Sequence, residues 1–351
     1  MPDTFVTASP HWTWFIIPYF FVGGIAGGAY FLAALLAWFG RPEDRPVIRT
    51  GYALAFWGAV LSGLLLTLDL GRSFRFWHML FQSDNFPHLM FKSFSPISFG
   101  AWALLLFGLC ALISWLVKSE GTLAKLIAAI CGLLGFFVAG YTGVLLSVTN
   151  RPIWADSPWL GALFLASGAS TGAAAIVLFA RNNGATEGSL RWIETFDTRA
   201  LVVELLLLVV FLISLGTVAK VWLSVWGFLL IVGVVGAGIL WPLLLHGKPA
   251  GAGALRNPAV MVLLGGLLLR FVVLLASNSI QFQRVVSGVT RRTRVGGFLF
   301  SPSPSQRARR APKPRGHVAA DRVRIQAITA PSCRCTPATS PTTRRPAGLR
   351  R

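Results

Sequence analysis

Eight apolar runs, each about 20 residues long, constrain the fold of this chain more than any other feature of its sequence. At about 1.5 Å of rise per residue, a helix of this length crosses the roughly 30 Å hydrocarbon core of a bilayer. Only 13% of the residues are charged, about half the share of a soluble domain, which excludes an ordinary soluble fold. The pattern predicts an all-α integral membrane protein whose eight transmembrane helices form two four-helix bundles. The expected helices cover residues 12–39, 51–70, 96–117, 123–148, 159–180, 200–219, 222–245 and 258–277.

The positive charge of the chain is concentrated at its C-terminal end. Residues 281–351 hold 16 of the 32 lysines and arginines and a single acid, Asp321. The net charge of +20 therefore does not predict nucleic-acid binding by the membrane-embedded part. We expect a transmembrane quinone-binding domain over residues 1–280 and a basic disordered tail over 281–351, because the tail has too few apolar residues to fold. A reading-frame shift near residues 277–280 of a GC-rich gene is an alternative origin of this tail.

Lysines and arginines in the loops predict the orientation, since cytoplasmic loops carry more of them. Loops on the N-terminal side carry five and the opposite loops carry ten. Four arginines just behind the last helix nearly equalise this count. We expect a multi-pass protein of the cell's inner (plasma) membrane with both termini outside.

Histidine placement bears on the redox centre that the chain could hold. A haem inside a helical bundle needs axial ligands within the helices, usually histidine. None of the histidines lies in the middle of an expected helix, and no cysteine cluster or phosphate-binding loop is present. We therefore expect no haem and no redox centre of the chain's own. The histidines are His11, His78, His88, His246 and His317.

Polar side chains gather at the expected outer ends of the first four helices. Aspartate, arginine, histidine and tyrosine beside an apolar interior suit a ligand with a polar head and a long apolar tail, such as a quinone. Its carbonyls need hydrogen-bond donors, and its redox chemistry needs groups that exchange protons. Trp and Tyr alone would also fit an aromatic belt at the membrane interface. The predicted quinone site comprises Tyr19, Asp69, Arg72, Arg75, His78, Tyr141, Asn150 and Arg151.

Two charges lie within expected helices, where an ionisable residue indicates function by default because burial in lipid is costly. Glu204 and Arg270, together with Asp69, form the predicted proton path across the membrane. A purely structural ion pair is the alternative for the two intramembrane charges. They would also suit a secondary transporter or ion-conducting protein with a helix interrupted at Trp241-Pro242, although no internal repeat supports this class. A third possibility is a structural anchor with no quinone site.

Glycines spaced four residues apart predict close helix packing. Gly23, Gly24, Gly27 and Gly28 form two overlapping pairs, and Gly168 with Gly172 forms another. Such pairs let two helix backbones approach closely in lipid.

Several motifs in order carry a resemblance to a known family. The most specific is YTGVLLSVTNRPIW at 141–154, followed by LFLASGASTG at 163–172. The others are GGIAGGAY at 23–30, DLGRSFRFWH at 69–78, SPISFGAW at 95–102 and LLGGLLLRFVV at 263–273. With these motifs, residues 11–277 resemble the NrfD/PsrC-type membrane subunits of polysulfide reductase and related iron–sulfur molybdoenzymes. The resemblance implies a haem-free anchor that binds menaquinone or ubiquinone at the outer face.

The resemblance also implies partners and roles. A four-cluster ferredoxin-like iron–sulfur subunit would connect the quinone site with a molybdopterin catalytic subunit, so that the clusters and the molybdopterin belong to the partners and the chain itself is not catalytic. Tyr141 matches a tyrosine that contacts the quinone head, and Tyr19 matches a polar contact on the first helix. Arg75 and His78 match the loop over the site, and Asp69 falls near an acidic position involved in proton movement. Ile16 stands roughly where some relatives have asparagine.

Overall fold

The computed structural model describes residue 12 and residues 14–82, 88–117, 121–245 and 256–296, with only the backbone for 256–257 and 280–296. Helices dominate this part of the chain, and the β-structure within it is one isolated bridge between Phe81 and Leu89. The helical elements are α1 (Ile16–Phe39), η1 (Pro42–Asp44), α2 (Arg45–Asp69), η2 (Ser73–Met79), α3 (Pro96–Leu116), α4 (Thr122–Ser147), α5 (Leu160–Ala180), η3 (Arg181–Asn183), α6 (Glu187–Ser214), η4 (Gly216–Leu223), α7 (Val225–Phe228), the π-helix η5 (Leu229–Leu240), α8 (Trp241–Leu245) and α9 (Arg256–Gly296).

Seven helical segments of the described residues are long and apolar enough to cross a membrane. One of them, Val225–Leu245, joins α7, η5 and α8 and continues through Pro242. The structure has an eighth candidate span if α6 and η4 are counted as one broken helix, whose two parts meet at a bend of 110°. The predicted all-α integral membrane fold is confirmed.

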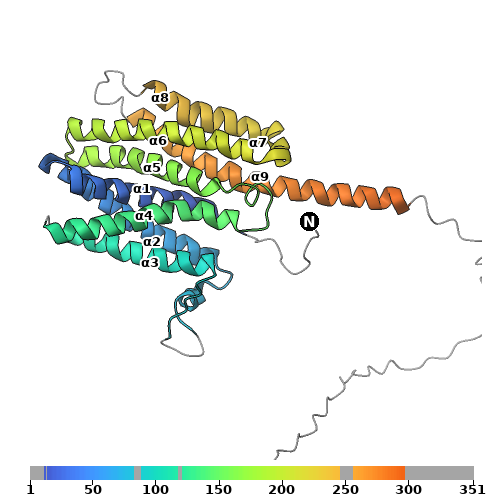
Figure 1. Cartoon of the computed structure of the whole chain (residues 1–351), viewed down its shortest axis with the longest axis horizontal. Coiled ribbons are helices and arrows are strands. Elements are labelled where there is room, and N and C mark those ends of the chain that lie inside the picture. Colours follow the sequence, from blue (N-terminus) through green and yellow to red (C-terminus); the bar gives the residue numbers. More distant parts are fainter. Residues whose placement is uncertain (1–11, 13, 83–87, 118–120, 246–255, 297–351) are drawn as a thin grey trace, which may run out of the picture. The chain divides into compact units, whose positions relative to one another are not determined.

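The helices form two groups (Figure 1). In the first, α1 packs against α2 and α4, while α3 packs against α2 and α4. In the second, α5 contacts α6 and α6 contacts η5. The second group closes where Gly238 of η5 meets Gly265 of α9, since a Cβ added at Gly238 would lie 2.6 Å from the Gly265 Cα. Contacts of α5 with α1 and α4 join the two groups.

Local sequence explains where α3 and α6 begin. Ser95 caps α3 by accepting a hydrogen bond from the Ser98 N–H, and Pro96 follows at the first helical position, where its missing N–H costs nothing. Thr186 caps α6 in the same way through the Ser189 N–H.

The prediction for α6 was wrong at both ends. The expected helix covered residues 200–219, whereas α6 begins at Glu187 and ends at Ser214. Its first three turns carry charged residues, so an apolar run does not reveal them. After Leu215 the chain turns into η4, with Gly216 in the left-handed region at φ +52°.

The helix α9 runs to Gly296, beyond its expected end at residue 277. Residues 297–351, most of the predicted tail, lie outside the described residues. The tail and its origin stay predictions.

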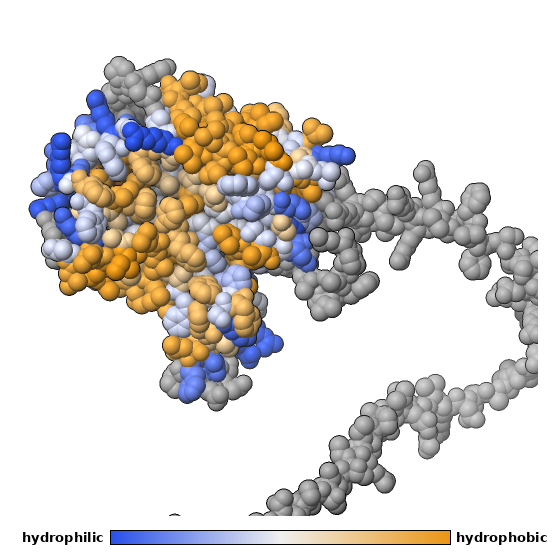
Figure 2. Space-filling view, in the orientation of Figure 1, coloured by the Kyte–Doolittle hydropathy of each residue, from blue (hydrophilic) through white to orange (hydrophobic). Residues whose placement is uncertain are grey.

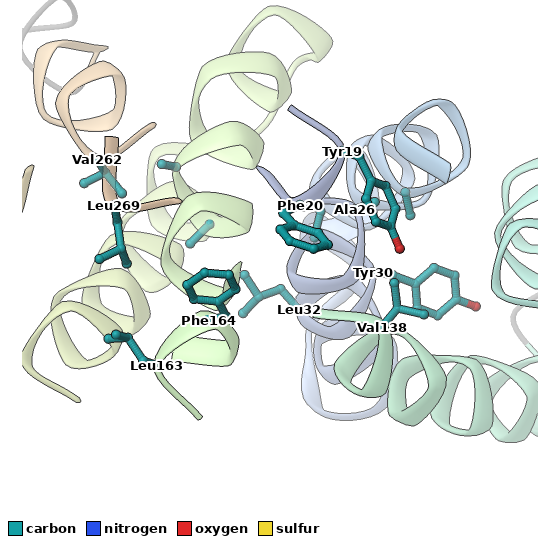
Figure 3. Packing of buried hydrophobic residues seen from close by; sticks show 14 of the residues in the cluster. Tyr19, Phe20, Ala26, Tyr30, Leu32, Val138, Leu163, Phe164, Val262 and Leu269 are labelled. Carbon is teal, nitrogen blue, oxygen red and sulfur yellow. The ribbon is translucent and has the colours of Figure 1, made fainter. Parts of the chain in front are cut away.

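The glycine pairs pack closely, as predicted, and the structure shows that they bring α1 and α5 into backbone contact. A Cβ added at Gly28 would lie 2.8 Å from the carbonyl carbon of Gly168, and one at Gly172 would lie 2.6 Å from that of Gly28. Cβ atoms do not approach other backbone this closely. On the same face of α1, Phe20 points toward Phe164 of α5 with ring centroids 6.3 Å apart (Figure 3).

The outward faces of the helices are apolar, which suits lipid rather than water. Leu133, Ile213 and Leu244 are between 68% and 74% exposed. Figure 2 shows apolar surface along the sides of the helices and hydrophilic residues gathered at their ends.

Candidate functional site

Three hydroxyl groups come together inside the first group of helices. Tyr19 of α1, Ser62 of α2 and Tyr141 of α4 are all buried. A Cβ added at Gly23 would lie 3.6 Å from Ser62 Oγ and 3.8 Å from Tyr19 Cε2, so both side chains border the same glycine. Tyr19 and Tyr141 are close enough to interact electrostatically. The structure thus brings together the two tyrosines that the sequence predicted, and adds Ser62.

The Ser62 hydroxyl is the unexplained member of this hydroxyl cluster (Tyr19, Ser62 and Tyr141). Ser62 Oγ is fully buried and makes no hydrogen bond to any of the described residues. Buried polar groups in proteins are nearly always paired, and each exception needs a reason. A ligand carbonyl beside Tyr19 would supply the missing partner. Sequence reasoning missed this residue because a lone serine in an apolar helix gives no signal.

The Tyr141 hydroxyl is fixed against the start of α3. It donates a hydrogen bond to the Pro96 carbonyl oxygen at 2.6 Å, and a Cβ added at Gly100 would clash with this hydroxyl. Gly100 therefore gives Tyr141 its position. An oxygen that donates to Pro96 can still accept a hydrogen bond or exchange its proton when a ligand arrives.

The predicted loop over the site follows α2. Asp69 is the last residue of α2 and is half-buried. Arg72, just before η2, and Arg75, within η2, are both exposed. His78 is half-buried, its Nδ1 lies 3.0 Å from the Arg75 carbonyl oxygen, and its ring stacks on Trp77 at 3.8 Å between centroids. These four residues share one loop, connected through α2 to Ser62.

Arg151 belongs to a different cluster. It is buried, donates a hydrogen bond from Nη1 to Asn278 Oδ1 of α9, and lies 5.0 Å from the ring centroid of Trp154. Burial lowers the pKa of its guanidinium. Trp154 stacks on Trp12 at 5.3 Å and donates to the Val273 carbonyl at 3.0 Å. The contacts above place Arg151 against α9, whereas Tyr141 lies against α3, so the structure divides the predicted outer site.

The turn that carries Arg151 is strained. Ile153 has φ +71°, a left-handed conformation that a β-branched residue adopts at a cost. Its N–H donates to Asp156 Oδ2 at 3.0 Å, and the Ala155 N–H donates to the Arg151 carbonyl at 3.0 Å. Asn150, the remaining residue of the predicted site, is exposed at the start of this turn. A cavity of about 140 Å³ opens beside Arg151, Trp12 and Trp154.

Arg270 of α9 is the most completely buried charge in the described part of the chain. Its side chain is 0% exposed, and Nε donates to the Phe20 carbonyl of α1 at 3.1 Å. Nη1 donates to the Gly266 carbonyl at 2.8 Å and to Ser167 Oγ of α5 at 3.0 Å. The Glu204 carboxyl interacts with the same Ser167 hydroxyl and with the Arg270 charge. The two intramembrane charges that the sequence paired therefore lie in one buried region, with Ser167 bonded directly to Arg270 and no direct Arg270–Glu204 ion pair among the described contacts.

A second buried acid extends this arrangement, and sequence reasoning missed it. Asp197 of α6 is 3% exposed and accepts a hydrogen bond from Ser170 Oγ of α5 at 2.7 Å. It lies two turns before Glu204 and interacts with it electrostatically. The sequence signal that could have revealed Asp197 is the helix cap at Thr186. Because α6 begins directly after this cap, Asp197 lies within the helix and not in the loop that the sequence predicted. Asp69, by contrast, lies at the end of α2 in the other group of helices and is not part of this network.

Two further cavities, like the one beside Arg151, have linings that do not include Tyr19, Ser62 or Tyr141. One of about 410 Å³ lies at the opposite end of the first group of helices, between the end of α1 and the start of α4. One of about 330 Å³ is an apolar groove between α1, α2, α5 and α9. Within the described residues, no three His, Cys, Asp or Glu side chains gather in a way that could hold a metal ion.

Comparison with known proteins agrees with this architecture. The family model described as "Polysulphide reductase, NrfD" matches residues 3–281. The chain is 28% identical over 304 residues to one subunit of the polysulfide reductase of Wolinella succinogenes, covering 76% of this chain and 94% of that protein. It is 29% identical to the protein NrfD of Escherichia coli, covering 76% and 95%, and 30% identical to an NrfD homolog of Haemophilus influenzae, covering 69% and 85%. With its membrane-spanning helices, the chain belongs to the polysulphide reductase NrfD family of integral membrane proteins.

Proposed function

We propose that this chain is the quinone-binding membrane anchor of a multi-subunit oxidoreductase, exchanging electrons between the membrane quinone pool and an iron–sulfur partner subunit. Membership of the NrfD family supports the anchor role in an oxidoreductase complex. The observation that carries the quinone assignment is the unpaired, buried hydroxyl of Ser62, which borders Gly23 together with Tyr19, one of the two tyrosines that the sequence selected. A menaquinone or ubiquinone would supply the redox chemistry, and the iron–sulfur clusters and molybdopterin would belong to the partners.

The residues of the hydroxyl cluster have separate roles in this proposal. Ser62 and Tyr19 donate hydrogen bonds to one carbonyl of the quinone head. Tyr141, held by Pro96 and Gly100, exchanges a proton with the other carbonyl. His78 and Asp69 in the loop after α2 connect this proton to water at the outer face. Arg72 and Arg75 provide positive charge where the reduced ligand or the partner approaches.

The second group of helices provides a proton path in this proposal. The acids Asp197 and Glu204 lie two turns apart on α6, and the hydroxyls of Ser170 and Ser167 face them from α5. Arg270 closes this path at its outer end, where it also bonds the Phe20 carbonyl near the start of α1. The two carboxyl groups take up and release protons and the serine hydroxyls pass them on, while Arg270 stays protonated and acts as a fixed positive charge. With both termini outside, the acids would lead from Arg270 toward the cytoplasm.

Purification from native membranes in a mild detergent tests the function as a whole. The expected result is recovery of an iron–sulfur subunit, a molybdopterin subunit and about one quinone per chain, since the proposed site binds a single quinone head group. Mass spectrometry of the proteins and of the extracted lipids measures all three. Recovery of the chain alone, without quinone, would contradict the proposal and favour a transporter.

The substitution Tyr141→Phe tests the hydroxyl cluster. We expect it to lower quinol turnover by about a hundredfold, at the lower end of what a positioned proton-transfer group contributes. Tyr30→Phe is the matched control, because it also removes a buried tyrosine hydroxyl, which bonds Ser114 at 2.6 Å outside the cluster. His78→Ala should also reduce turnover while leaving assembly intact. Turnover by Tyr141→Phe and His78→Ala equal to that of Tyr30→Phe would refute the assignment.

A further inference from the structure

One cavity lies far from the hydroxyl cluster and has a lining rich in basic side chains. Its volume is about 410 Å³, and it is formed by the end of α1, the start of α2, the end of α3 and the start of α4. We call it the basic pocket and define it by four basic residues that line it, Arg41, Arg45, Arg49 and Lys125. None of the described residues that line it is acidic.

The helix geometry of α2 explains how these charges come together. Arg45, Arg49 and Tyr52 are spaced by four and three residues, so they lie along one face of the helix. Lys125 approaches from α4, whose start is fixed to α1 because Trp38 Nε1 donates to the Lys125 carbonyl oxygen at 2.7 Å. The basic pocket is therefore built on four helix ends rather than on a loop.

Of the described acids, Glu43 and Asp44 belong to the turn that carries Arg41, and neither lines the basic pocket. Glu43 pairs with Arg41 at 3.5 Å, but both side chains are more than half exposed, so this ion pair contributes little. Asp44 is buried, accepts from the Arg41 N–H at 2.7 Å and accepts a hydrogen bond from the Ser189 hydroxyl. Its charge is directed at α6. An anionic ligand would bring negative charge to a lining whose described residues include four basic side chains and no acid.

The rest of the lining is apolar and opens toward lipid. Ile48 and Ile113 form walls one to two turns inside the helix ends. At the edge, Val117 is 53% exposed, and Phe39 and Leu116 nearby are 83% and 61% exposed. Large apolar side chains exposed at a helix end are expected to contact acyl chains, while arginine and lysine extend to the headgroup level.

We propose that the basic pocket binds the phosphodiester headgroup of an anionic phospholipid, with the acyl chains along α1 and α3. Basic pockets between transmembrane helices are known to select anionic headgroups. A soluble phosphate is also negatively charged, but it has no apolar part that could contact the apolar walls. A phospholipid has both, because its headgroup can bind the basic side chains and its acyl chains can bind the apolar ones. This inference concerns the end of the helices opposite to the proposed quinone site and does not depend on it.

Native mass spectrometry of the purified full-length chain tests this proposal by titration with short-chain phosphatidylglycerol and, separately, phosphatidylcholine. We expect preferential binding of phosphatidylglycerol and a loss of about thirtyfold in affinity in the double variant Arg45→Gln/Arg49→Gln, from the contribution of each basic residue near an anionic headgroup. The charge-matched control is Arg191→Gln/Arg199→Gln, two exposed arginines of α6 outside the basic pocket. Arg45→Lys/Arg49→Lys should retain most of the binding and shows that loss of charge, rather than misfolding, is responsible.

Three results would overturn the proposal. The first is equal affinity for the two lipids, and the second is equal loss in the control variant. The third is displacement of bound phosphatidylglycerol by millimolar inorganic phosphate or glycerol phosphate, which would identify a soluble anion as the ligand.

Discussion

Arg270→Gln is expected to be among the most damaging single substitutions in this protein. It leaves the Glu204 carboxyl buried among α5, α6 and α9 without the charge that balances it. Removing one partner of a direct buried ion pair usually costs about 3–5 kcal/mol, whereas Arg270 and Glu204 interact over a longer distance and make no direct ion pair. Because Ser167 lies between the two groups, we expect the lower end of this range, about 3 kcal/mol. Thermal unfolding of the purified chain in detergent measures this loss.

A double-mutant cycle separates the charge imbalance from lost packing. Glu204→Gln alone should cost less than Arg270→Gln, since Arg270 keeps its bonds to the carbonyls of Phe20 and Gly266. The double variant Arg270→Gln/Glu204→Gln should recover more than half of the stability that Arg270→Gln loses, because neutral isosteres of a buried pair are often tolerated. If Glu204 belongs to the proton path, however, the double variant should still lack the proton uptake that is coupled to quinol turnover, because the carboxyl group is gone. Arg199→Gln, an exposed arginine on α6, is the control for charge alone.

A double variant no more stable than Arg270→Gln would show that Glu204 does not balance Arg270. Recovery of both stability and proton uptake would show that the pair is structural only.

The spans and the central charge of this protein could be predicted from sequence for one physical reason. A bilayer requires about 20 apolar residues per crossing, so the helices appear as runs and a charge within a run stands out. Arg270 was recognised in this way, and the structure places it in one buried region with Glu204 and Ser167. That α1 and α5 pack closely through their glycines was also predicted, because few residues other than glycine permit backbone contact, but which helices meet is known only from the structure.

Other features depend on three-dimensional contacts that no run reveals. Asp197 was missed because charged residues at the start of α6 resemble a loop, although the helix extends over them and buries this acid. Arg151 and Tyr141 both follow from one motif, yet one packs on α9 and the other on α3. The basic pocket is lined by residues from four helix ends that lie far apart in the sequence. No pattern in the sequence indicates that their charges line one cavity, which is seen only in the structure.

Gly28→Ala should destabilise the protein although it adds a single methyl group. The new Cβ would lie 2.8 Å from the Gly168 carbonyl carbon and 3.1 Å from the Ala169 Cα, both backbone atoms of α5. Backbone cannot move aside as a side-chain end can, so α1 and α5 must separate. Overpacking of this kind costs about 1–3 kcal/mol, and here it exceeds the gain of roughly 1 kcal/mol in helix propensity from glycine to alanine.

Gly63→Ala is the matched control, because Gly63 lies within α2 and its added Cβ would meet no atom within 4 Å. We expect this variant to be as stable as the natural chain or more stable, and Gly28→Ala to unfold at a lower temperature. Gly24→Ala should also destabilise the protein, since its Cβ would lie 2.7 Å from Nη2 of Arg270, whose buried guanidinium is held by hydrogen bonds to α1 and α5. Equal stability of Gly28→Ala and Gly63→Ala would contradict the close packing of α1 and α5.

The same contact connects helix packing to the proposed proton path. Arg270 donates to α1 at the Phe20 carbonyl and to α5 at Ser167, on the two helices that Gly28 and Gly168 hold together. If Gly28→Ala separates these helices, the guanidinium cannot keep both bonds. We therefore expect Gly28→Ala to impair proton uptake as well as stability, whereas Gly63→Ala changes neither. Normal proton uptake in a Gly28→Ala protein of lowered stability would show that the path does not depend on Arg270 spanning α1 and α5.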